Sequence, residues 1–290
     1  MRIVVVGAGA WGTAFSELLR ALGHEVTLVG RAAIDDAPYE RAELVALAVP
    51  SRSFREALGH VRGDAPVLSL SKGLDPATGD RLSTLVRDRP VAVLSGPNMA
   101  EEVAAGLPGA TVVASEDEAL ARRLQEALNS PQFRVYVNTD LIGVELCGAS
   151  KNVIALSAGG VDGLGLGDNA KAALITRGLV EMARLGEACG AEPETFAGLA
   201  GMGDLIASCW HPSARNRRAG ELIARGASAD AARAAIGQVV EGLTTAPVLR
   251  DLSHRLGIEL PITEGVCAVL EGMSLHDLLG SLMGRRPTDE

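Results

Sequence analysis

The sequence predicts an α/β fold, a doubly wound and mostly parallel sheet followed by an all-α C-terminal domain. Two observations predict it. Over the first half of the chain, short apolar runs typical of buried strands alternate with helix-like stretches, which is the pattern of a parallel sheet with right-handed crossovers. After about Asp140 the strand pattern stops and helical periodicity takes over. We therefore divide the chain into residues 1–140 and 141–290.

The strand candidates share uncharged, often β-branched cores, as expected of strands buried on both faces. They are RIVVV at 2–6, EVTLVG at 25–30, ELVALAV at 43–49, PVLSL at 66–70, VAVLS at 91–95, ATVVA at 110–114 and FRVYV at 133–137. A helix is expected from about Trp11 to Leu22, where Gly23 ends it, and another at 116–129.

The second half reads as helices separated by glycine and proline. Its clearest stripe has apolar residues four and three positions apart, the spacing of one helix face. The stripe consists of Ile142, Leu146, Ala149, Val153 and Leu156. Further helices are expected at 170–189 and 244–256, and the charged tail RRPTDE is expected to fray.

Composition excludes several classes of protein. Of the 290 residues, 47% are apolar and 22% charged, as in ordinary soluble proteins. The net charge of -9 argues against a nucleic-acid partner, because phosphate backbones require a basic surface. We expect no membrane insertion, since no uncharged apolar run reaches the roughly 20 residues of a membrane helix.

Cysteine and histidine usage indicates a cytoplasmic protein without a metal. The four cysteines are widely spaced and form no CxxC pair, which favours free thiols in a reducing compartment. The five histidines show no ligand spacing, so we expect no metal site. The chain opens directly into a strand, so we expect no signal peptide.

Gly7, Gly9 and Gly12 form a G-x-G-x-x-G pattern that closes the first strand and opens the first helix. This context predicts a Rossmann-type phosphate-binding turn. Gly7 allows a tight turn, Gly9 lets a pyrophosphate approach the backbone, and Gly12 lets helix and strand pack closely. The helix N-terminus then offers free N–H groups. We therefore expect residues 1–140 to bind a dinucleotide.

The residues at the end of the second strand indicate which dinucleotide the site prefers. An NAD site usually has an acidic residue there, whereas this chain has Gly30 and Arg31, which favours the 2′-phosphate of NADPH. Asp35 and Asp36 lie close by and weaken the argument, and Arg31 as a solvated loop residue is the alternative. NADH stays open as a cofactor.

Only three of the 27 basic residues are lysines, Lys72, Lys151 and Lys171. Lysine can exchange a proton near neutral pH and arginine cannot, so a lysine kept in an arginine-rich chain can mark a reaction centre. Lys72 and Lys151 stand alone in apolar, glycine-rich segments and are the candidates. The alternative is that biased codon usage accounts for the many arginines and that the three lysines remain by chance. This alternative is the better interpretation of Lys171.

Several ordered motifs accompany the glycine turn, and together they resemble the NAD(P)-dependent glycerol-3-phosphate dehydrogenases of the soluble bacterial type. The motifs are GAGAWGTA, SKGL (71–74), SGPNMAEE (95–102), GASKNVIA (148–155), GMGDL (201–205) and RNRR (215–218). The resemblance covers nearly the whole chain. It implies reversible reduction of dihydroxyacetone phosphate to glycerol 3-phosphate, a product that supplies phospholipid synthesis.

The resemblance also implies site residues. Lys151 matches the family's catalytic lysine. The implied substrate-binding residues are Lys72, Gly96, Asn98, Lys151, Asn152, Asp204, Ala214, Arg215 and Asn216. The implied cofactor contacts, with the glycines of the turn, are Gly7, Gly9, Ala10, Trp11, Gly12, Arg31, Lys72, Ala100, Arg215, Val239 and Glu241.

Residue chemistry agrees with these roles. An ammonium at Lys151 can stabilise the charge that develops on a ketone oxygen and deliver a proton to it. The small neighbours Gly148 and Ala155 leave space for a ligand, or they permit close helix packing. Asp204 pairs with the lysine, or it caps a helix.

Two further groups suit the substrate. Asn152 is a neutral donor for a hydroxyl group. Arg215 offers a planar fork for a phosphate, unless the segment RNRR is only a solvated charged face.

The chain departs from the family at three places. Ala214 stands where the family usually has Ser, and Asn98 replaces a usual Ser or Thr. Between Arg31 and Glu43 the family normally carries an additional helix, loop and edge strand, whereas here residues 32–42 alone make the connection. This shortening is near the minimum for a parallel crossover and puts the adenosine side of the cofactor pocket in doubt.

Two other functions stay open. A ketopantoate-reductase-like or hydroxyacid dehydrogenase shares the glycine turn, the helical second domain and Lys-Asn chemistry. The shortened segment also allows a non-catalytic NADP(H)-binding sensor. In each case the expected partner is a small molecule, phosphorylated in the leading interpretation, and assembly as a homodimer is left open.

Overall fold

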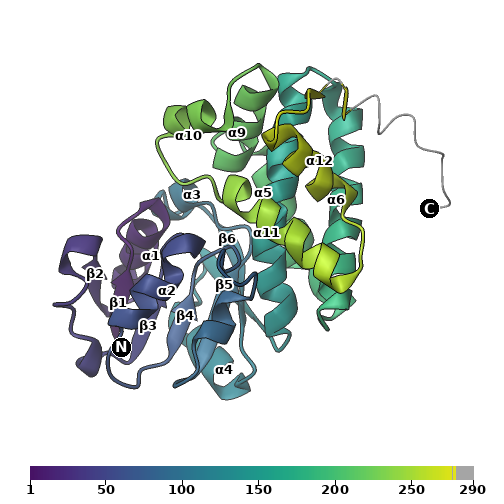
Figure 1. The fold of residues 1–290 in the computed structure, drawn as a ribbon. Helices are drawn as coiled ribbons and strands as arrows, with labels where there is room; N and C mark the ends of the chain where they lie inside the picture. Colours follow the sequence, from purple (N-terminus) through teal and green to yellow (C-terminus); the bar gives the residue numbers. More distant parts are fainter. Residues whose placement is uncertain (276, 279–290) are drawn as a thin grey trace.

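A seven-stranded sheet forms the first part of the protein, in a computed structural model that describes residues 1–275 and 277–278 (Figure 1). The strands are β1 (Arg2–Val6), β2 (Glu25–Val29), β3 (Leu44–Leu47), β4 (Val67–Ser69), β5 (Val91–Ser95), β6 (Gly109–Ala114) and β7 (Phe133–Asn138). Their order is β2-β1-β3-β4-β5-β6-β7, and every neighbouring pair is parallel except β5 and β6. The predicted fold class is confirmed. The tail RRPTDE lies outside the described residues.

Helices cover both faces of the sheet, as its apolar strands require. On one face, α1 (Ala10–Ala21) and α4 (Glu118–Leu128) pack through Phe15 and Leu124. On the other face, α2 (Ser51–His60) packs through Phe54 against Val45 of β3. The apolar stripes of α1, α2 and α4 therefore close the two side layers of the first domain.

The short link between β2 and β3 still covers its part of the sheet. It consists of two 3₁₀ turns, Arg31–Ala33 (η1) and Tyr39–Arg41 (η2). Tyr39 is 1% exposed and joins the apolar cluster that contains Val45 and Phe54. Its ring fills space under the link, and β2 remains paired with β1 at the sheet edge although no α-helix connects β2 to β3.

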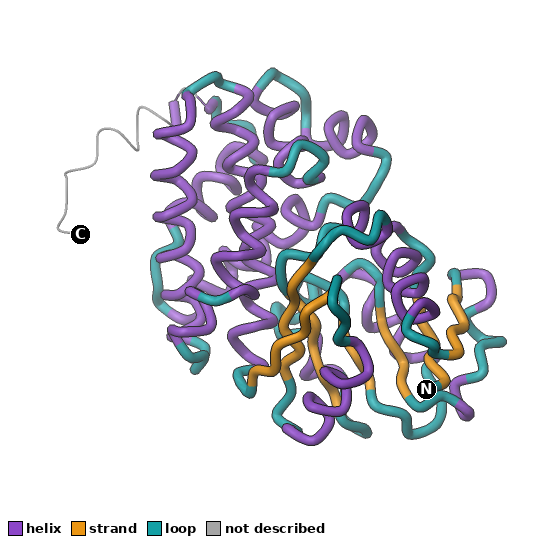
Figure 2. Tube along the Cα trace, turned by 180° about the vertical axis from the view of Figure 1, so that it is seen from behind, coloured by secondary structure: helices purple, strands orange, loops and turns teal. Residues whose placement is uncertain are grey.

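The second part of the chain is helical within the described residues, and Figure 2 shows its helices standing beside the sheet. Its helices are α5 (Leu141–Gly163), α6 (Gly167–Ala188), α7 (Pro193–Ala197), α8 (Asp204–Trp210), α9 (Arg215–Ala224), α10 (Ala229–Ile236), α11 (Glu241–Leu256) and α12 (Pro261–Leu270). A single π-helical turn, η4 (Leu199–Gly203), precedes α8. The segments predicted at 170–189 and 244–256 correspond to α6 and α11.

Helix α5 is the centre of this part. Asp140 begins it, because its carboxylate accepts a hydrogen bond from the Gly143 N–H (2.8 Å). The helices α6, α8, α9, α11 and α12 all pack around α5. It is long and apolar enough to cross a membrane by length and composition alone, but 89% of its most apolar window is buried inside the protein. That burial is typical of the core helix of a globular domain.

Replacing Tyr39 tests whether its ring supports the short link. Tyr39→Ala should lower the free energy of unfolding by about 3–5 kcal/mol, because it leaves a cavity under the link. Tyr39→Phe should cost nothing or stabilise, because the buried hydroxyl has no hydrogen-bond partner among the described residues. Urea denaturation measures both variants. Equal losses in the two would show that the hydroxyl, and not the ring, matters.

Candidate active site

A pocket of about 570 Å³ lies where the strands end at their carboxyl edge, between the sheet and the helical part. From the sheet it is lined by the segments 9–11, 48–50, 70–72 and 98–101, which follow β1, β3, β4 and β5. The chain leaves β1 toward β2 on one side, and β3 lies on the other side of β1. Crevices at such a point are the usual ligand sites of open parallel sheets.

The glycine turn at the end of β1 is shaped as predicted. Gly7 has φ +113°, and a Cβ there would lie 2.3 Å from the Ala48 carbonyl oxygen. A Cβ on Gly12 would lie 1.9 Å from the Gly7 carbonyl oxygen, so helix and strand need glycine to pack this closely. A Cβ on Gly9 would meet nothing within 4 Å, which leaves its backbone open to the pocket.

The N-terminus of α1 has no side-chain cap and no acidic residue in its first turn. Its N–H groups are therefore available to an anion, and the helix dipole favours one there. An uncapped helix end beside an open glycine backbone fits the pyrophosphate of a dinucleotide.

Two lysines share one carboxylate in the pocket. Lys151 Nζ lies 2.5 Å from Asp204 Oδ1, and Lys72 Nζ lies 2.8 Å from Asp204 Oδ2. Lys151 also donates to Ser208 Oγ (2.9 Å). The predicted pairing of Asp204 with Lys151 is confirmed, and the alternative that Asp204 caps a helix is wrong, because its side chain does not cap α8.

Lys72 is positioned by the turn that follows β5. Its ammonium donates to the Gly96 carbonyl oxygen (3.3 Å) and to Asn98 Oδ1 (3.0 Å). The Asn98 amide in turn donates to Thr111 Oγ1 (3.0 Å). A Cβ on Gly148 would lie 3.5 Å from Lys72 Cγ. The expectation that Gly148 leaves space for a ligand is therefore wrong, because the Lys72 side chain occupies that space.

Asn152 connects the two parts of the protein. Its amide N–H groups donate to the Lys72 carbonyl oxygen (2.9 Å) and to the Gly148 carbonyl oxygen (3.1 Å). Its oxygen accepts a hydrogen bond from Asn216 (2.8 Å). The expectation of a free donor for a substrate hydroxyl is corrected here, because both N–H groups are engaged and Asn152 positions Lys72.

The three charges set the protonation of the site. Burial lowers the pKa of Lys151 to about 7, Asp204 opposes this shift, and the positive charge of Lys72 adds to it. Burial alone would raise the pKa of Asp204, but attraction first to Lys151 and then to Lys72 holds it below its usual value. One carboxylate cannot neutralise two ammonium groups, and Lys151 is the more buried of the two lysines.

Arg215 begins α9 and lines the same pocket. It makes no ion pair or side-chain hydrogen bond with a described residue. The Arg215 side chain is exposed toward the pocket, but protein atoms surround much of it. This partial burial lowers the pKa of Arg215, and the negative charges of Glu241 and Glu101 oppose the shift. Ala214, which precedes it, is buried and supplies no polar group.

Glu241 lines the pocket but is committed to the protein. Its carboxylate accepts hydrogen bonds from Ser51 N–H (3.1 Å) and Ser51 Oγ (2.7 Å), at the start of α2. Burial raises the pKa of Glu241, and these two bonds oppose the rise. The contact joins the first turn of α11 to the part that contains the sheet.

Arg31 is not part of the pocket wall. It is exposed at the start of η1, where its guanidinium lies 3.4 Å from Glu56 Oε2. Asp35, which could have turned toward a ribose, instead pairs with His60 (2.7 Å). The shortened segment thus leaves the strand end with an exposed arginine.

Most of the predicted site residues come together. Those that line the pocket are Gly9, Ala10, Trp11, Lys72, Asn98, Ala100, Lys151, Asn152, Asp204, Ala214, Arg215, Asn216, Val239 and Glu241. Gly7, Gly12, Gly96 and Arg31 do not line it. Sequence reasoning missed Ser208, Glu101, Ser213, Arg218 and Gln238. Ser208 had one signal, its position one helical turn after Asp204.

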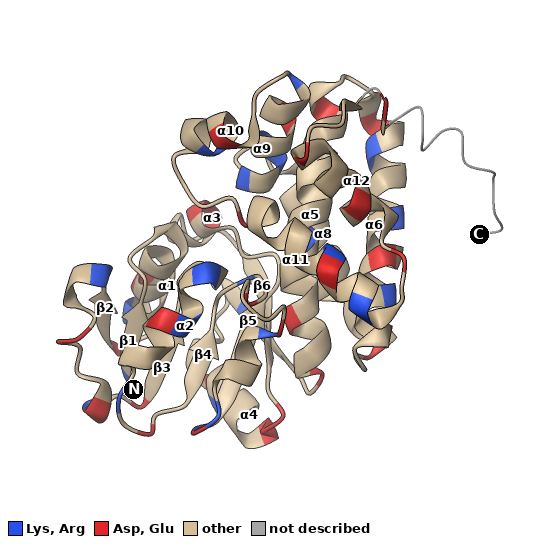
Figure 3. Ribbon diagram, viewed as in Figure 1, with Lys and Arg blue, Asp and Glu red and all other residues tan. Residues whose placement is uncertain are grey.

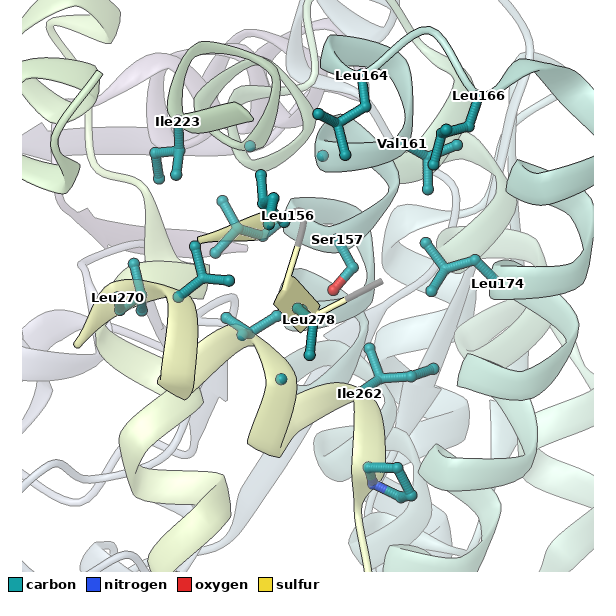
Figure 4. Close-up of a pocket in the computed structure, with 17 residues that line it drawn as sticks. Leu156, Ser157, Val161, Leu164, Leu166, Leu174, Ile223, Ile262, Leu270 and Leu278 are labelled. Carbon is teal, nitrogen blue, oxygen red and sulfur yellow. The ribbon is translucent and has the colours of Figure 1, made fainter. Parts of the chain in front are cut away.

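A second cavity, of about 120 Å³, lies within the helical part and is lined by Leu156, Val161, Leu174 and other apolar side chains (Figure 4). Ser157 is the hydroxyl that Figure 4 shows among them. This cavity has no titratable side chain on its wall, so it is not the reaction site. Among the described residues, no group of three or more His, Cys, Asp or Glu could hold a metal ion.

A dinucleotide crevice that faces a buried lysine titrating near neutrality is suited to moving a hydride and a proton together. The class of protein is therefore an NAD(P)-dependent oxidoreductase. Residues 36–121 match the family described as NAD-dependent glycerol-3-phosphate dehydrogenase N-terminus, and residues 140–279 match the C-terminus of the same family. The chain belongs to the NAD-dependent glycerol-3-phosphate dehydrogenase family, and its cofactor is NAD(P)H.

Individual relatives agree. The chain is 44% identical to glycerol-3-phosphate dehydrogenase [NAD(P)+] of Nocardia farcinica over 330 aligned positions, which cover 98% of each chain. The structure is similar to that of glycerol-3-phosphate dehydrogenase from Coxiella burnetii, with a TM-score of 0.92, 36% identity and coverage of 98% and 99%. An alignment longer than this chain means that the Nocardia relative has residues without counterparts here.

The ketopantoate-reductase alternative shares only the fold. A ketopantoate reductase from Ralstonia eutropha gives a TM-score of 0.59 at 20% identity, covering 93% of this chain and 97% of its own. The family match also favours an enzyme over a non-catalytic sensor.

Asp204→Asn tests the shared carboxylate. Without this charge, repulsion from Lys72 is unopposed, so the pKa of Lys151 should fall further below about 7. Ketone reduction at pH 7 should then slow, by about tenfold whenever that pKa falls by one. The pH dependence of kcat/KM measures the midpoint. Asp75→Asn is the matched control, because it removes the buried partner of Arg55 (2.5 Å) outside the pocket. A midpoint that Asp204→Asn leaves unmoved would contradict the account.

Proposed function

We propose that this enzyme reduces dihydroxyacetone phosphate to glycerol 3-phosphate, prefers NADPH, and uses Lys151 as its general acid. The observation that supports this most is the buried Lys151 ammonium in the pocket wall, whose pKa lies at about 7. A general acid works best when its pKa lies near the working pH. Its partner Asp204 fixes its position at 2.5 Å.

The bound cofactor supplies the hydride that reduces the ketone carbon. As negative charge grows on the ketone oxygen, the Lys151 ammonium stabilises it and donates the proton that completes the alcohol. Lys72 adds a second positive charge beside the same carboxylate. Arg215 has no ion pair with a described residue and can take the substrate phosphate as a planar fork.

We further propose that the product supplies phospholipid synthesis and that the enzyme works in the cytoplasm. Glycerol 3-phosphate is the backbone to which such a pathway adds acyl chains. The free cysteines Cys147, Cys189, Cys209 and Cys267 suit a reducing compartment. A homodimer is proposed on the family resemblance alone, and light scattering coupled to size-exclusion chromatography tests it.

Two substitutions of Lys151 test the general acid. Lys151→Met should keep the fold and cofactor binding but lower kcat by roughly 10²–10⁴ or more. Lys151→Arg should fail as well, because a guanidinium does not titrate in this range. In the wild type, reduction should decline as pH rises through about 7, and the reverse oxidation, which needs the neutral amine as base, should increase.

Steady-state rates of NADPH oxidation with dihydroxyacetone phosphate measure these effects. Cofactor fluorescence titration and the melting temperature serve as controls for folding. Near-normal turnover of Lys151→Met would remove this residue from the mechanism while leaving the family assignment intact.

Arg31 is proposed to set the preference for NADPH. It lies exposed at the end of β2, and its weak surface pair with Glu56 costs little to break. Arg31→Ala should weaken NADPH binding by about 1.5–3 kcal/mol, the value of a charge-assisted hydrogen bond, and should change NADH binding little. Gly30→Asp should shift preference toward NADH, since a carboxylate repels the 2′-phosphate. A wild-type enzyme with higher kcat/KM for NADH would overturn the role of Arg31.

A further inference from the structure

The segment RNRR at the start of α9 contains three arginines with different surroundings. Arg217 is committed to the protein: its guanidinium pairs with Asp162 and with Glu221 (3.4 Å) and donates to the His211 carbonyl oxygen (3.3 Å). Arg217 therefore fixes α9 against the end of α5 and the loop before it. It does not line the pocket.

Arg215 and Arg218 both line the pocket. Residues three apart on a helix lie on the same side, one turn from each other. Both side chains are exposed, and neither guanidinium makes an ion pair or hydrogen bond with a residue that the structure describes. Figure 3 shows the basic positions on α9 in blue.

The other charges of the pocket are already committed. Lys72 and Lys151 share Asp204. Glu241 accepts from Ser51, and Glu101 accepts from Ser213 Oγ (2.7 Å). The two arginines of α9 are thus the pocket cations without a partner among the described residues, in a protein of net charge -9.

We propose that Arg218 is a second phosphate-recognising residue, which forms with Arg215 a two-guanidinium clamp for the substrate phosphate and draws the dianion into the pocket. A phosphate monoester carries close to two negative charges and three acceptor oxygens. One guanidinium fork engages two oxygens, and a second cation one helical turn away can engage the third. A local positive potential in an acidic protein also raises the rate of association of an anion.

This inference rests on the proposed binding of the substrate phosphate by Arg215, and the two placements are separable. Arg215→Ala and Arg218→Ala are each assayed with dihydroxyacetone phosphate and with unphosphorylated dihydroxyacetone, at low and high salt. A phosphate-specific loss in Arg218→Ala without one in Arg215→Ala would correct the role of Arg215 and leave that of Arg218 standing.

Arg225→Ala is the matched control. Arg225 follows the last residue of α9, pairs with Glu221 (2.6 Å) and does not line the pocket, and its loss changes the net charge by the same amount. Arg218→Ala should lower kcat/KM for dihydroxyacetone phosphate about tenfold or more, with kcat and the KM for NADPH nearly unchanged. It should also flatten the salt dependence of kcat/KM. Arg225→Ala should do neither.

Arg218→Lys separates charge from geometry and guards against a folding defect in the alanine variant. It should retain the salt dependence but recover only part of the lost kcat/KM, because an ammonium lacks the planar fork. Three results would overturn the proposal: Arg218→Ala behaving like Arg225→Ala, equal losses with and without the substrate phosphate, or a change confined to the KM for NADPH.

Discussion

The site depends on one carboxylate that serves two ammonium groups. Asp204 comes from α8, Lys151 from α5, and Lys72 from the loop after β4 in the nucleotide-binding part. Burial is the main cause that lowers the pKa of Lys151 to about 7; the positive charge of Lys72 adds to this shift and Asp204 opposes it. The proton that the reaction needs is thus held loosely by the arrangement of charges.

The trio spans both parts of the protein, so its geometry depends on how they are joined. Asn152, which follows Lys151 on α5, donates a hydrogen bond from its side-chain amide to the Lys72 carbonyl oxygen. At another edge of the crevice, Glu241 accepts hydrogen bonds from Ser51 at the start of α2. Both contacts use polar side chains that line the pocket but have most of their hydrogen-bonding capacity engaged within the protein. Asn98, Asn152 and Ser208 therefore position the two lysines of the pocket. Arg215 and Arg218 of α9 have no such partner among the described residues and are available to bind a ligand.

Sequence alone could predict the parts whose chemistry allows few residue types. Lysines that survive in an arginine-rich chain pointed to Lys151 and Lys72, and both lie in the site. The expectation that Gly148 leaves space for a ligand was wrong. A glycine in the sequence shows that no side chain stands at that position, but it does not show that the Lys72 side chain fills the space beside it. Ser208 was missed because its position one helical turn after Asp204 does not reveal its contact with Lys151, which only the structure shows. Likewise, the sequence showed only that the link between β2 and β3 is short. The packing in the structure was needed to show that the buried Tyr39 ring fills the space under this link.

Because the chain has only three lysines, the pKa of Lys151 can be measured directly. Protein labelled with ¹³C at the lysine ε-carbon should give three signals, whose shifts report each ammonium as pH is raised. One signal should titrate with a midpoint near 7 and disappear in the Lys151→Met variant. Three signals that all titrate at about 10 or above, as unperturbed lysines do, would contradict it.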